Sequence, residues 1–182
     1  MPVRILRGNV LDASADALIL TMDGVRRGMG GTVAHAFARR WPEAFGEIED
    51  QIAYPVPSGR AVATWPESEC PFPTVFMAAM LHHLDVLPDS PKAGVVASAL
   101  VQALGLAVRH RRYTIATAVM TGGWRLRLAR ALGTMLEASQ FLAREDAAVS
   151  LAIHVLDDEA VAQARVVAAS RGLPVGGGPA PQ

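Results

Sequence analysis

Cysteine and lysine are nearly absent from the sequence. Its 182 residues include one cysteine, Cys70, which excludes an internal disulfide and any zinc site built from several cysteines. Lys92 is the only lysine, so arginine supplies the other 16 of the 17 basic residues. The base composition of a genome explains this bias as readily as anion binding does, so the bias assigns no function by itself.

A charge excess and a long apolar run are also missing. The 17 basic residues balance the 17 acidic ones, which argues against a strongly basic nucleic-acid binder and against an acidic disordered chain. The N-terminus has no apolar segment typical of a secretory signal, and the most apolar stretch, Gly94–Val108, is shorter than the ~20 residues of a membrane span. We expect a soluble, cytoplasmic protein that does not bind membranes.

Apolar residues, in contrast, are plentiful. They make up 51% of the chain, which at this length is typical of one domain with a sizeable core. We expect this domain to cover residues 1–171. Residues 172–182 are rich in glycine and proline and predict a disordered tail.

Short apolar runs predict strands that are covered by helices on both faces. The runs are Val3–Leu6, Ala17–Thr21, Val75–Met80, Thr114–Val119 and Val149–Val155, with a weaker one at Arg60–Thr64. Periodicity, caps and N-terminal prolines predict helices over Thr32–Arg40, Glu43–Ile52, Ser90–Arg109 and Arg127–Ala143, and a last helix from Asp157 or Asp158 to about Ser170. Alternating strands and helices predict the α/β class, as a three-layer α/β/α sandwich with a mixed, largely parallel central sheet.

Two glycine-containing loops each connect a predicted strand to a predicted helix. They are Gly28–Thr32 and Thr121–Trp124. Glycine lets the backbone approach a ligand closely, and a helix N-terminus offers unpaired N–H groups to an anion. Two such loops at the carboxyl ends of strands suit a diphosphate, although each is also compatible with a simple tight turn.

A Rossmann-type dinucleotide site is the obvious alternative for the first loop. Gly28 and Gly30 begin its fingerprint, but Val33 stands where the third glycine belongs, and the loop begins seven residues past Thr21. We therefore reject this interpretation.

The ordered set of motifs resembles the macrodomain family, which binds ADP-ribose. Macrodomains have a Gly-Asp-Ile-Thr-like turn, a strand reading Asp-Ala-Ile-Val-Asn-Ala-Ala-Asn, a Gly-Gly-Gly-Val loop and a Ser/Thr-x-Gly-x-x-Gly loop. The corresponding segments here are Gly8–Leu11, Asp16–Asp23, Gly30–Val33 and Thr121–Arg125, within a resemblance that spans Val3–Arg171. The resemblance implies a macrodomain fold with these ligand-binding residues: Asn9, Val10, Asp23, Gly30, Gly31, Thr32, Val33, Thr121, Gly122, Gly123, Trp124, Arg125 and Leu156.

Several positions depart from the family pattern. Asn9 replaces an aspartate that accepts a hydrogen bond from the adenine amino group, and Leu156 replaces an aromatic residue that packs on adenine. Thr32 replaces the third glycine of the first loop. Leu20 replaces one of two asparagines that face the distal ribose, and Ala34 replaces an aspartate of many hydrolytic members. These changes predict weaker adenine recognition and absent or very slow removal of ADP-ribose from proteins.

Three polar or aromatic positions have two interpretations each. Asp23, at the second asparagine position, can accept hydrogen bonds from sugar hydroxyls or act as a base, but it also fits a turn before Gly24. Trp124 fits a cover over the distal ribose or a core anchor for its loop. Arg125 fits a phosphate contact or a solvated helix start.

The histidines and the cysteine give no pattern for a metal site. His35 lies one turn into a helix, within reach of the predicted cleft, whereas the adjacent His82 and His83 point apart on any regular element. Cys70 has no evident basic neighbour that would make it a nucleophile. We expect neither a metal nor a cofactor.

The favoured function is metal-free binding of ADP-ribose or a related nucleotide diphosphate, either free or attached to an ADP-ribosylated protein. An alternative is an enzyme of the same fold, an ADP-ribosyl or ribose-phosphate hydrolase. A third possibility is a macro-like scaffold with a degenerate pocket that acts in protein interaction.

Overall fold

Six strands form a single mixed sheet in the computed structural model, which describes residues 2–81, 89–121, 126–143 and 149–172. The strand order is β1-β6-β5-β2-β4-β3, and all neighbours are parallel except β3 and β4. The strands are β1 (Val3–Arg7), β2 (Ala17–Asp23), β3 (Ala61–Thr64), β4 (Val75–Leu81), β5 (Thr114–Ala118) and β6 (Ser150–Val155). The predicted strands are thus confirmed, with ends shifted by one or two residues.

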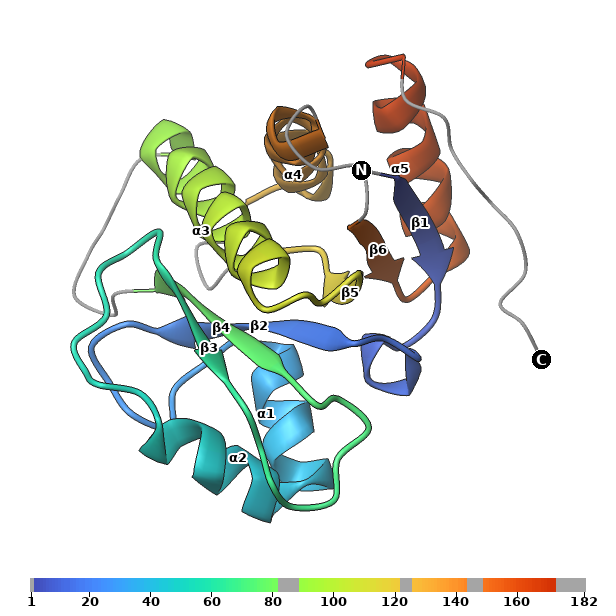
Figure 1. Ribbon diagram of the computed structural model, residues 1–182. Helices are drawn as coiled ribbons and strands as arrows, with labels where there is room; N and C mark the ends of the chain where they lie inside the picture. Colours follow the sequence, from blue (N-terminus) through green and yellow to red (C-terminus); the bar gives the residue numbers. More distant parts are fainter. Residues whose placement is uncertain (1, 82–88, 122–125, 144–148, 173–182) are drawn as a thin grey trace.

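Among the described residues, five α-helices cover the two faces of this sheet. They are α1 (Thr32–Arg40), α2 (Pro42–Asp50), α3 (Asp89–Arg109), α4 (Leu128–Ala143) and α5 (Asp158–Ala169). Helices α3, α4 and α5 lie on one face and α1 and α2 on the other (Figure 1). The structure therefore has the predicted three-layer α/β/α architecture.

Two local expectations need correction. Helix α3 begins at Asp89, so Ser90 and Pro91 lie inside its first turn rather than at its N-cap and first position; the first turn tolerates proline because its N–H groups have no partner within the helix. A short 3-10 helix, η1 (Val10–Asp12), was not predicted. Its signal is Asn9, whose side-chain oxygen accepts a hydrogen bond from the Leu11 N–H at 3.1 Å.

Strand β2 is buried on both faces, which explains its continuous apolar run. Ile19 packs into the larger core, between the sheet and α3, α4 and α5. Leu18 and Leu20 point to the other side, into a smaller core with Phe37 of α1. Successive residues of a strand point to opposite faces, so this central strand belongs to both cores.

Helix α3 is apolar because it is a core helix. By length and composition alone, its segment Lys92–Arg109 is also able to span a membrane. In the structure the helix packs against β3, β4 and α4. Residues spaced three or four apart form its buried face: Val96, Ala99, Leu100, Ala103, Leu104 and Ala107.

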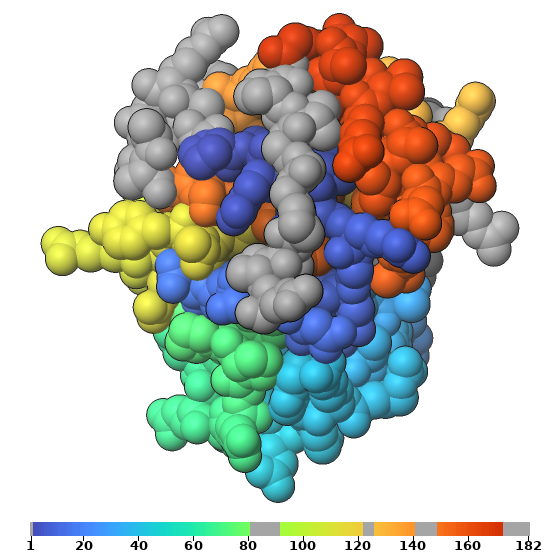
Figure 2. Space-filling model, turned by 90° about the vertical axis from the view of Figure 1, so that its right-hand side faces the viewer, coloured from blue at the N-terminus to red at the C-terminus, as the bar shows by residue number. Residues whose placement is uncertain are grey.

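Strand β1 is one edge of the sheet. Figure 2 shows its blue N-terminal segment at the surface, with the orange-red α5 on one side of it and the light-blue α1 and α2 layer on the other. Since β2, β5 and β6 are parallel, their carboxyl ends meet at one edge of the molecule, where loops lead into α1, α4 and α5. Open α/β sheets bind ligands at this kind of edge.

The amino-terminal ends of β2 and β5 are joined by Asp16. Its Oδ2 accepts hydrogen bonds from the N–H groups of Tyr113 and Thr114, each at 2.9 Å, and its own N–H donates to Thr114 Oγ1. Partial burial would raise the pKa of Asp16, but the Thr114 and Tyr113 N–H donors outweigh it and hold the pKa below its ordinary value of 3.8.

We predict that Asp16→Ala lowers the free energy of unfolding by about 1 kcal/mol near pH 7, because two backbone donors lose a charged acceptor. The folded-state pKa of Asp16 lies below the unfolded-state value, so its stabilisation is complete above about pH 4 and is lost as the pH falls further. Urea unfolding at pH 7 and pH 3 measures both effects. Asp50→Ala, which removes an exposed ion pair with Arg27, is the control and should change little; equal losses for both variants would contradict the prediction.

Candidate functional site

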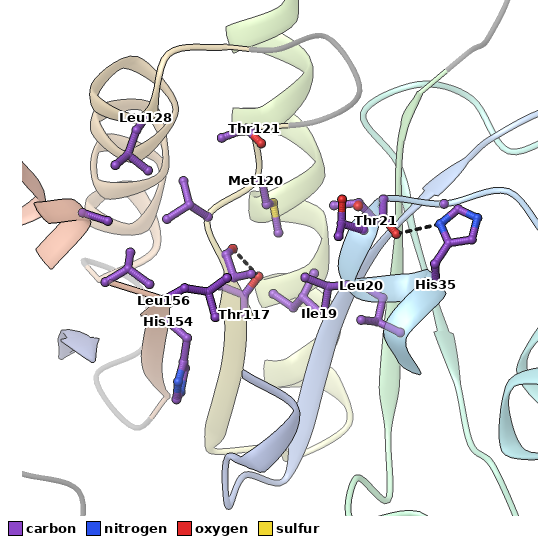
Figure 3. Close-up of a pocket in the computed structure, with 18 of the residues that line it drawn as sticks. Ile19, Leu20, Thr21, His35, Thr117, Met120, Thr121, Leu128, His154 and Leu156 are labelled. Atoms are coloured by element: carbon purple, nitrogen blue, oxygen red, sulfur yellow. Dashed lines mark hydrogen bonds between the residues drawn. The ribbon is translucent and has the colours of Figure 1, made fainter. Parts of the chain in front are cut away.

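A cavity of about 680 Å³ opens at the carboxyl ends of β2, β5 and β6. Figure 3 shows Thr21 and His35 on one side of it, Leu128 and Leu156 on the other, and Thr117 between them. The lining residues are Ile19, Leu20, Thr21, Gly30, Gly31, Thr32, Val33, His35, Thr117, Ala118, Val119, Met120, Thr121, Leu128, His154, Val155, Leu156, Asp157 and Ala160.

The first glycine loop packs directly on the end of β2. The Gly31 N–H donates to the Thr21 carbonyl at 3.1 Å, and Gly30 forms an isolated bridge with Met22. A Cβ atom on Gly31 would lie 2.4 Å from Thr21 Oγ1, and one on Gly30 would lie 2.7 Å from both the Thr21 carbonyl oxygen and Ala34 Cβ. The lack of space for a Cβ atom is therefore what requires glycine here. An unusual backbone conformation is not the reason at Gly31, because its φ of −72° is ordinary.

The N-terminus of α1 faces the same cavity. Gly31 is its N-cap and has no side chain to accept a hydrogen bond from the first N–H groups of the helix. Thr32 and Val33, the first helical residues, line the cavity. The loop and helix thus form the kind of N–H-rich corner that binds anions.

Of the second predicted loop, Thr121–Trp124, the structure describes only Thr121. Thr121 lines the cavity, and the Leu126 N–H donates to its carbonyl at 3.3 Å. Leu128, at the start of α4, lines the cavity as well. Gly122, Gly123, Trp124 and Arg125 lie outside the described residues, as do His82 and His83.

The end of β6 forms the opposite, more apolar wall. Leu156 is 74% exposed and lies beside the cavity together with Ala160 of α5. Asp157 also lines it, but this residue is the N-cap of α5 and its Oδ1 accepts from the Ala160 N–H at 2.7 Å. The carboxylate of Asp157 therefore caps α5. The sequence had left Asp157 and Asp158 as alternatives for the start of this helix.

Asn9 and Val10 are close to this wall without lining the cavity. The Gly8 N–H donates to the Val155 carbonyl at 2.8 Å, which holds the turn beside the end of β6. Val10 is buried beneath the sheet in the smaller core. This turn therefore lies near Leu156, but the side-chain oxygen of Asn9 accepts a hydrogen bond within η1, as its N-cap.

Asp23 does not line the cavity. It is 1% exposed, and its Oδ1 accepts hydrogen bonds from the N–H groups of Val25 at 2.8 Å and Arg26 at 3.1 Å. These contacts fit the second interpretation from sequence, in which Asp23 is an aspartate in a turn.

Sequence analysis missed several lining residues on the strands themselves. Thr21 and Thr117 are polar residues near the carboxyl ends of otherwise apolar strands, which is the signal that could have found them. His154 is another such residue. Burial lowers the pKa of His154, and within the described part of the chain both of its ring nitrogens are buried without a hydrogen-bond partner. Its ring points away from the other labelled side chains (Figure 3).

Metal-ligating residues do not gather in the part of the chain that the structure describes. There, no group of three or more histidine, cysteine, aspartate or glutamate residues has the arrangement to hold a metal ion. His35 lines the cavity, while Cys70 lies in a loop where burial raises its thiol pKa.

We predict that Gly31→Ala destabilises the protein by about 1–3 kcal/mol, the usual cost of overpacking, because its Cβ would overlap Thr21 Oγ1. Adding Thr21→Ala removes that oxygen and should recover most of the loss. Thermal unfolding of the two single variants and the double variant measures the coupling. Strictly additive effects would show that this contact does not constrain the loop.

Comparisons with known proteins give a clear result for structure and none for sequence. No protein-family model and no curated protein matches the chain. The macrodomain of Oceanobacillus iheyensis with ADP matches with a TM-score of 0.73 and 13% identity over 91% of this chain and 88% of that one.

Other macrodomains also match over most of this chain. The Trypanosoma brucei macrodomain in complex with ADP gives a TM-score of 0.75 at 16% identity, over 91% of this chain and 68% of that one. The macrodomain of Thermus aquaticus DarG gives 0.63 at 21% identity, over 84% and 97%. The chain therefore has the macrodomain fold, at low sequence identity to these structures.

Proposed function

We propose that the protein binds ADP-ribose, or a closely related nucleotide diphosphate, in the cavity at the carboxyl ends of β2, β5 and β6. The observation that carries the proposal is the corner formed by Gly30, Gly31 and the N-terminus of α1, which opens into that cavity. Two macrodomains of the same fold, from Oceanobacillus iheyensis and Trypanosoma brucei, have structures with ADP.

The size of the cavity supports a ligand of this class. Its volume of about 680 Å³ is within the range of small-molecule sites, roughly 300–1,000 Å³. An extended nucleotide with a second sugar needs a site with two ends and a central anion contact. The cavity has two such ends, one at the start of α1 and one at the start of α5.

Backbone N–H groups are the donors proposed for the diphosphate. Among the described residues that line the cavity, none is arginine or lysine. The partial positive charge at a helix N-terminus, together with its unpaired N–H groups, favours a phosphate without a cationic side chain or a metal.

The two ends of the cavity differ in polarity, which suggests the orientation of the ligand. Leu128, Leu156 and Ala160 make one end mainly apolar, as a flat base requires, while the Asp157 carboxylate at that end caps α5. Thr21, Thr32 and His35 make the other end polar, as a sugar requires. In this orientation the terminal sugar, by which ADP-ribose is attached to proteins, lies at the α1 end, so an ADP-ribosylated protein is a candidate partner.

We predict that Thr32→Glu reduces ADP-ribose affinity at least tenfold while the protein stays folded. An acidic residue suits the first turn of a helix, but here its charge would repel the diphosphate. In Thr32→Gln, the introduced side chain has nearly the same shape as glutamate but no charge, so this variant should bind ADP-ribose more tightly than Thr32→Glu. Calorimetry with ADP-ribose, after thermal unfolding confirms that both variants fold, measures the difference. The wild type must bind at millimolar ligand, or the proposed function is wrong.

A second candidate function, hydrolysis of ADP-ribosyl groups, has less support. Leu20 and Ala34 are 1% exposed apolar residues, so neither supplies an acid or a base at the cavity. We predict that release of ADP-ribose from a mono-ADP-ribosylated protein is absent or very slow, since a missing acid–base group typically costs ~10²–10⁴-fold in rate. Rapid turnover of the mono-ADP-ribosylated protein by the purified wild type would contradict this prediction.

A further inference from the structure

A run of basic residues ends helix α3 at the opposite end of the sheet from the cavity. The run is Arg109-His110-Arg111-Arg112, and Tyr113 joins it to β5. The cavity lies at the carboxyl ends of β2, β5 and β6, whereas this turn leads into the amino-terminal end of β5. The yellow segment around the turn protrudes on the left of Figure 2. A ligand bound here would therefore not occupy the cavity.

The arginines of this run are not neutralised by ion pairs. Within the described part of the chain, the ion pairs are formed by other arginines, and Arg109 and Arg111 are exposed. Arg112 acts electrostatically on Asp16, but the Asp16 carboxylate already accepts two backbone N–H groups. The Nε of Arg112 is buried and has no hydrogen-bond partner among the described residues. This turn is therefore locally positive, although the chain as a whole is neutral.

Arg111 has a backbone conformation that glycine normally adopts. Its φ is 55°. The Arg112 N–H donates to the Ala107 carbonyl at 2.8 Å, and the Arg111 N–H donates to the Val108 carbonyl at 3.1 Å. These two bonds form a Schellman motif with Arg111 at its left-handed position, where glycine is the usual residue because a side chain is unfavourable there. A charged residue at a position that suits glycine better indicates a role for the charge.

Two exposed aromatic side chains lie beside the same turn. Trp65, which follows β3, is 41% exposed, and Tyr113 is 47% exposed. The Gln51 amide fixes the backbone of Trp65, because it accepts the Trp65 N–H at 2.9 Å and donates to the Trp65 carbonyl at 3.0 Å. The Trp65 ring lies edge-on to His110, with ring centroids 5.1 Å apart.

The sheet sets the spacing of these two aromatic residues. Strands β4 and β2 lie between β3 and β5, so the end of β3 and the start of β5 are roughly 14 Å apart at the usual strand spacing. His110, which touches Trp65 and precedes Tyr113 by three residues, lies within this span. The basic run and the two rings thus belong to one surface.

Positive charge beside exposed aromatic rings matches the chemistry of a single-stranded nucleic acid. Its phosphates are attracted by arginine, and its unpaired bases stack on aromatic rings. A duplex keeps its bases stacked on one another, and an acidic peptide has no flat bases to cover the rings. Both would use only the charges of this surface.

We propose that the end of α3 and Trp65 form a second binding site, which takes single-stranded nucleic acid. The arginines of the turn contact phosphates, and the rings of Trp65 and Tyr113 stack on bases. The net charge of zero argues against a protein that binds nucleic acid through its overall charge, so a local site of this kind has modest affinity that depends strongly on salt. The proposal is independent of ADP-ribose binding.

The experiment measures binding of a short fluorescein-labelled oligo-dT to the full chain by fluorescence anisotropy, at several salt concentrations. We expect a Kd of about 10⁻⁴–10⁻⁶ M, the range of non-specific binding. Three phosphate contacts predict that log K falls against log salt with a slope of about −2. The same sequence as a duplex should bind more weakly.

Substitutions separate the charges from the rings. Arg111→Gln should weaken binding about fivefold at low salt and make the slope less steep by about 0.7, because one phosphate contact is lost. Trp65→Leu should weaken binding about fivefold or more without changing the slope, because stacking releases no counterions. Arg165→Gln is the matched control, since Arg165 is an exposed arginine on α5, and it should bind as the wild type does.

Arg111→Gly distinguishes a role in binding from a role in folding. Glycine suits the left-handed position, so this variant should keep or raise the melting temperature while it weakens oligo-dT binding as much as Arg111→Gln does. A loss of affinity in a protein that is no less stable is not explained by damage to the fold.

Three results would overturn the proposal. The first is no binding of oligo-dT by the wild type at protein concentrations up to about 10⁻⁴ M in low salt. The second is an equal loss of affinity in Arg165→Gln and Arg111→Gln, which would indicate diffuse attraction to the whole surface. The third is displacement of oligo-dT by polyglutamate as readily as by unlabelled oligo-dT, which would indicate a site for acidic proteins.

Discussion

The close contact between the first glycine loop and the end of β2 is the constraint on which the site depends. The Thr21 carbonyl accepts the Gly31 N–H, and neither Gly30 nor Gly31 has room for a Cβ atom. Because β2 is buried in both cores, it gives this loop a rigid support. The start of α1 therefore has a fixed position relative to the cavity.

Much of the fold could be predicted because the strands are buried on both faces. A strand such as β2, with Leu18, Ile19 and Leu20 all inside, is recognisable by its run of buried apolar residues. Alternation with helices then gives the layers. Helix ends were harder, as Ser90 illustrates, because serine and proline fit several positions of a first turn. The 3-10 helix η1 was missed because three residues carry no periodicity.

The lining of the cavity was predictable where it is made of backbone and less so where it is made of side chains. Gly30, Gly31 and Thr121 could be placed because strand-to-helix loops meet at one edge of a parallel sheet. Asp23 illustrates the limit: the sequence is compatible with a ligand contact and with a turn, and only the structure shows that its carboxylate accepts hydrogen bonds from the Val25 and Arg26 N–H groups.

The two edges of the sheet have consequences for how the protein behaves at high concentration. An unpaired strand edge is a template for another chain, and proteins protect such edges with short strands and charged side chains. At one edge, β3 has only four residues and follows Arg60 directly. At the other, β1 carries two exposed arginines, Arg4 and Arg7, among its five residues. Arginines at both edges of the sheet therefore oppose edge-to-edge association. In this chain, which has a single lysine, arginine takes the place of the lysines that commonly protect such edges.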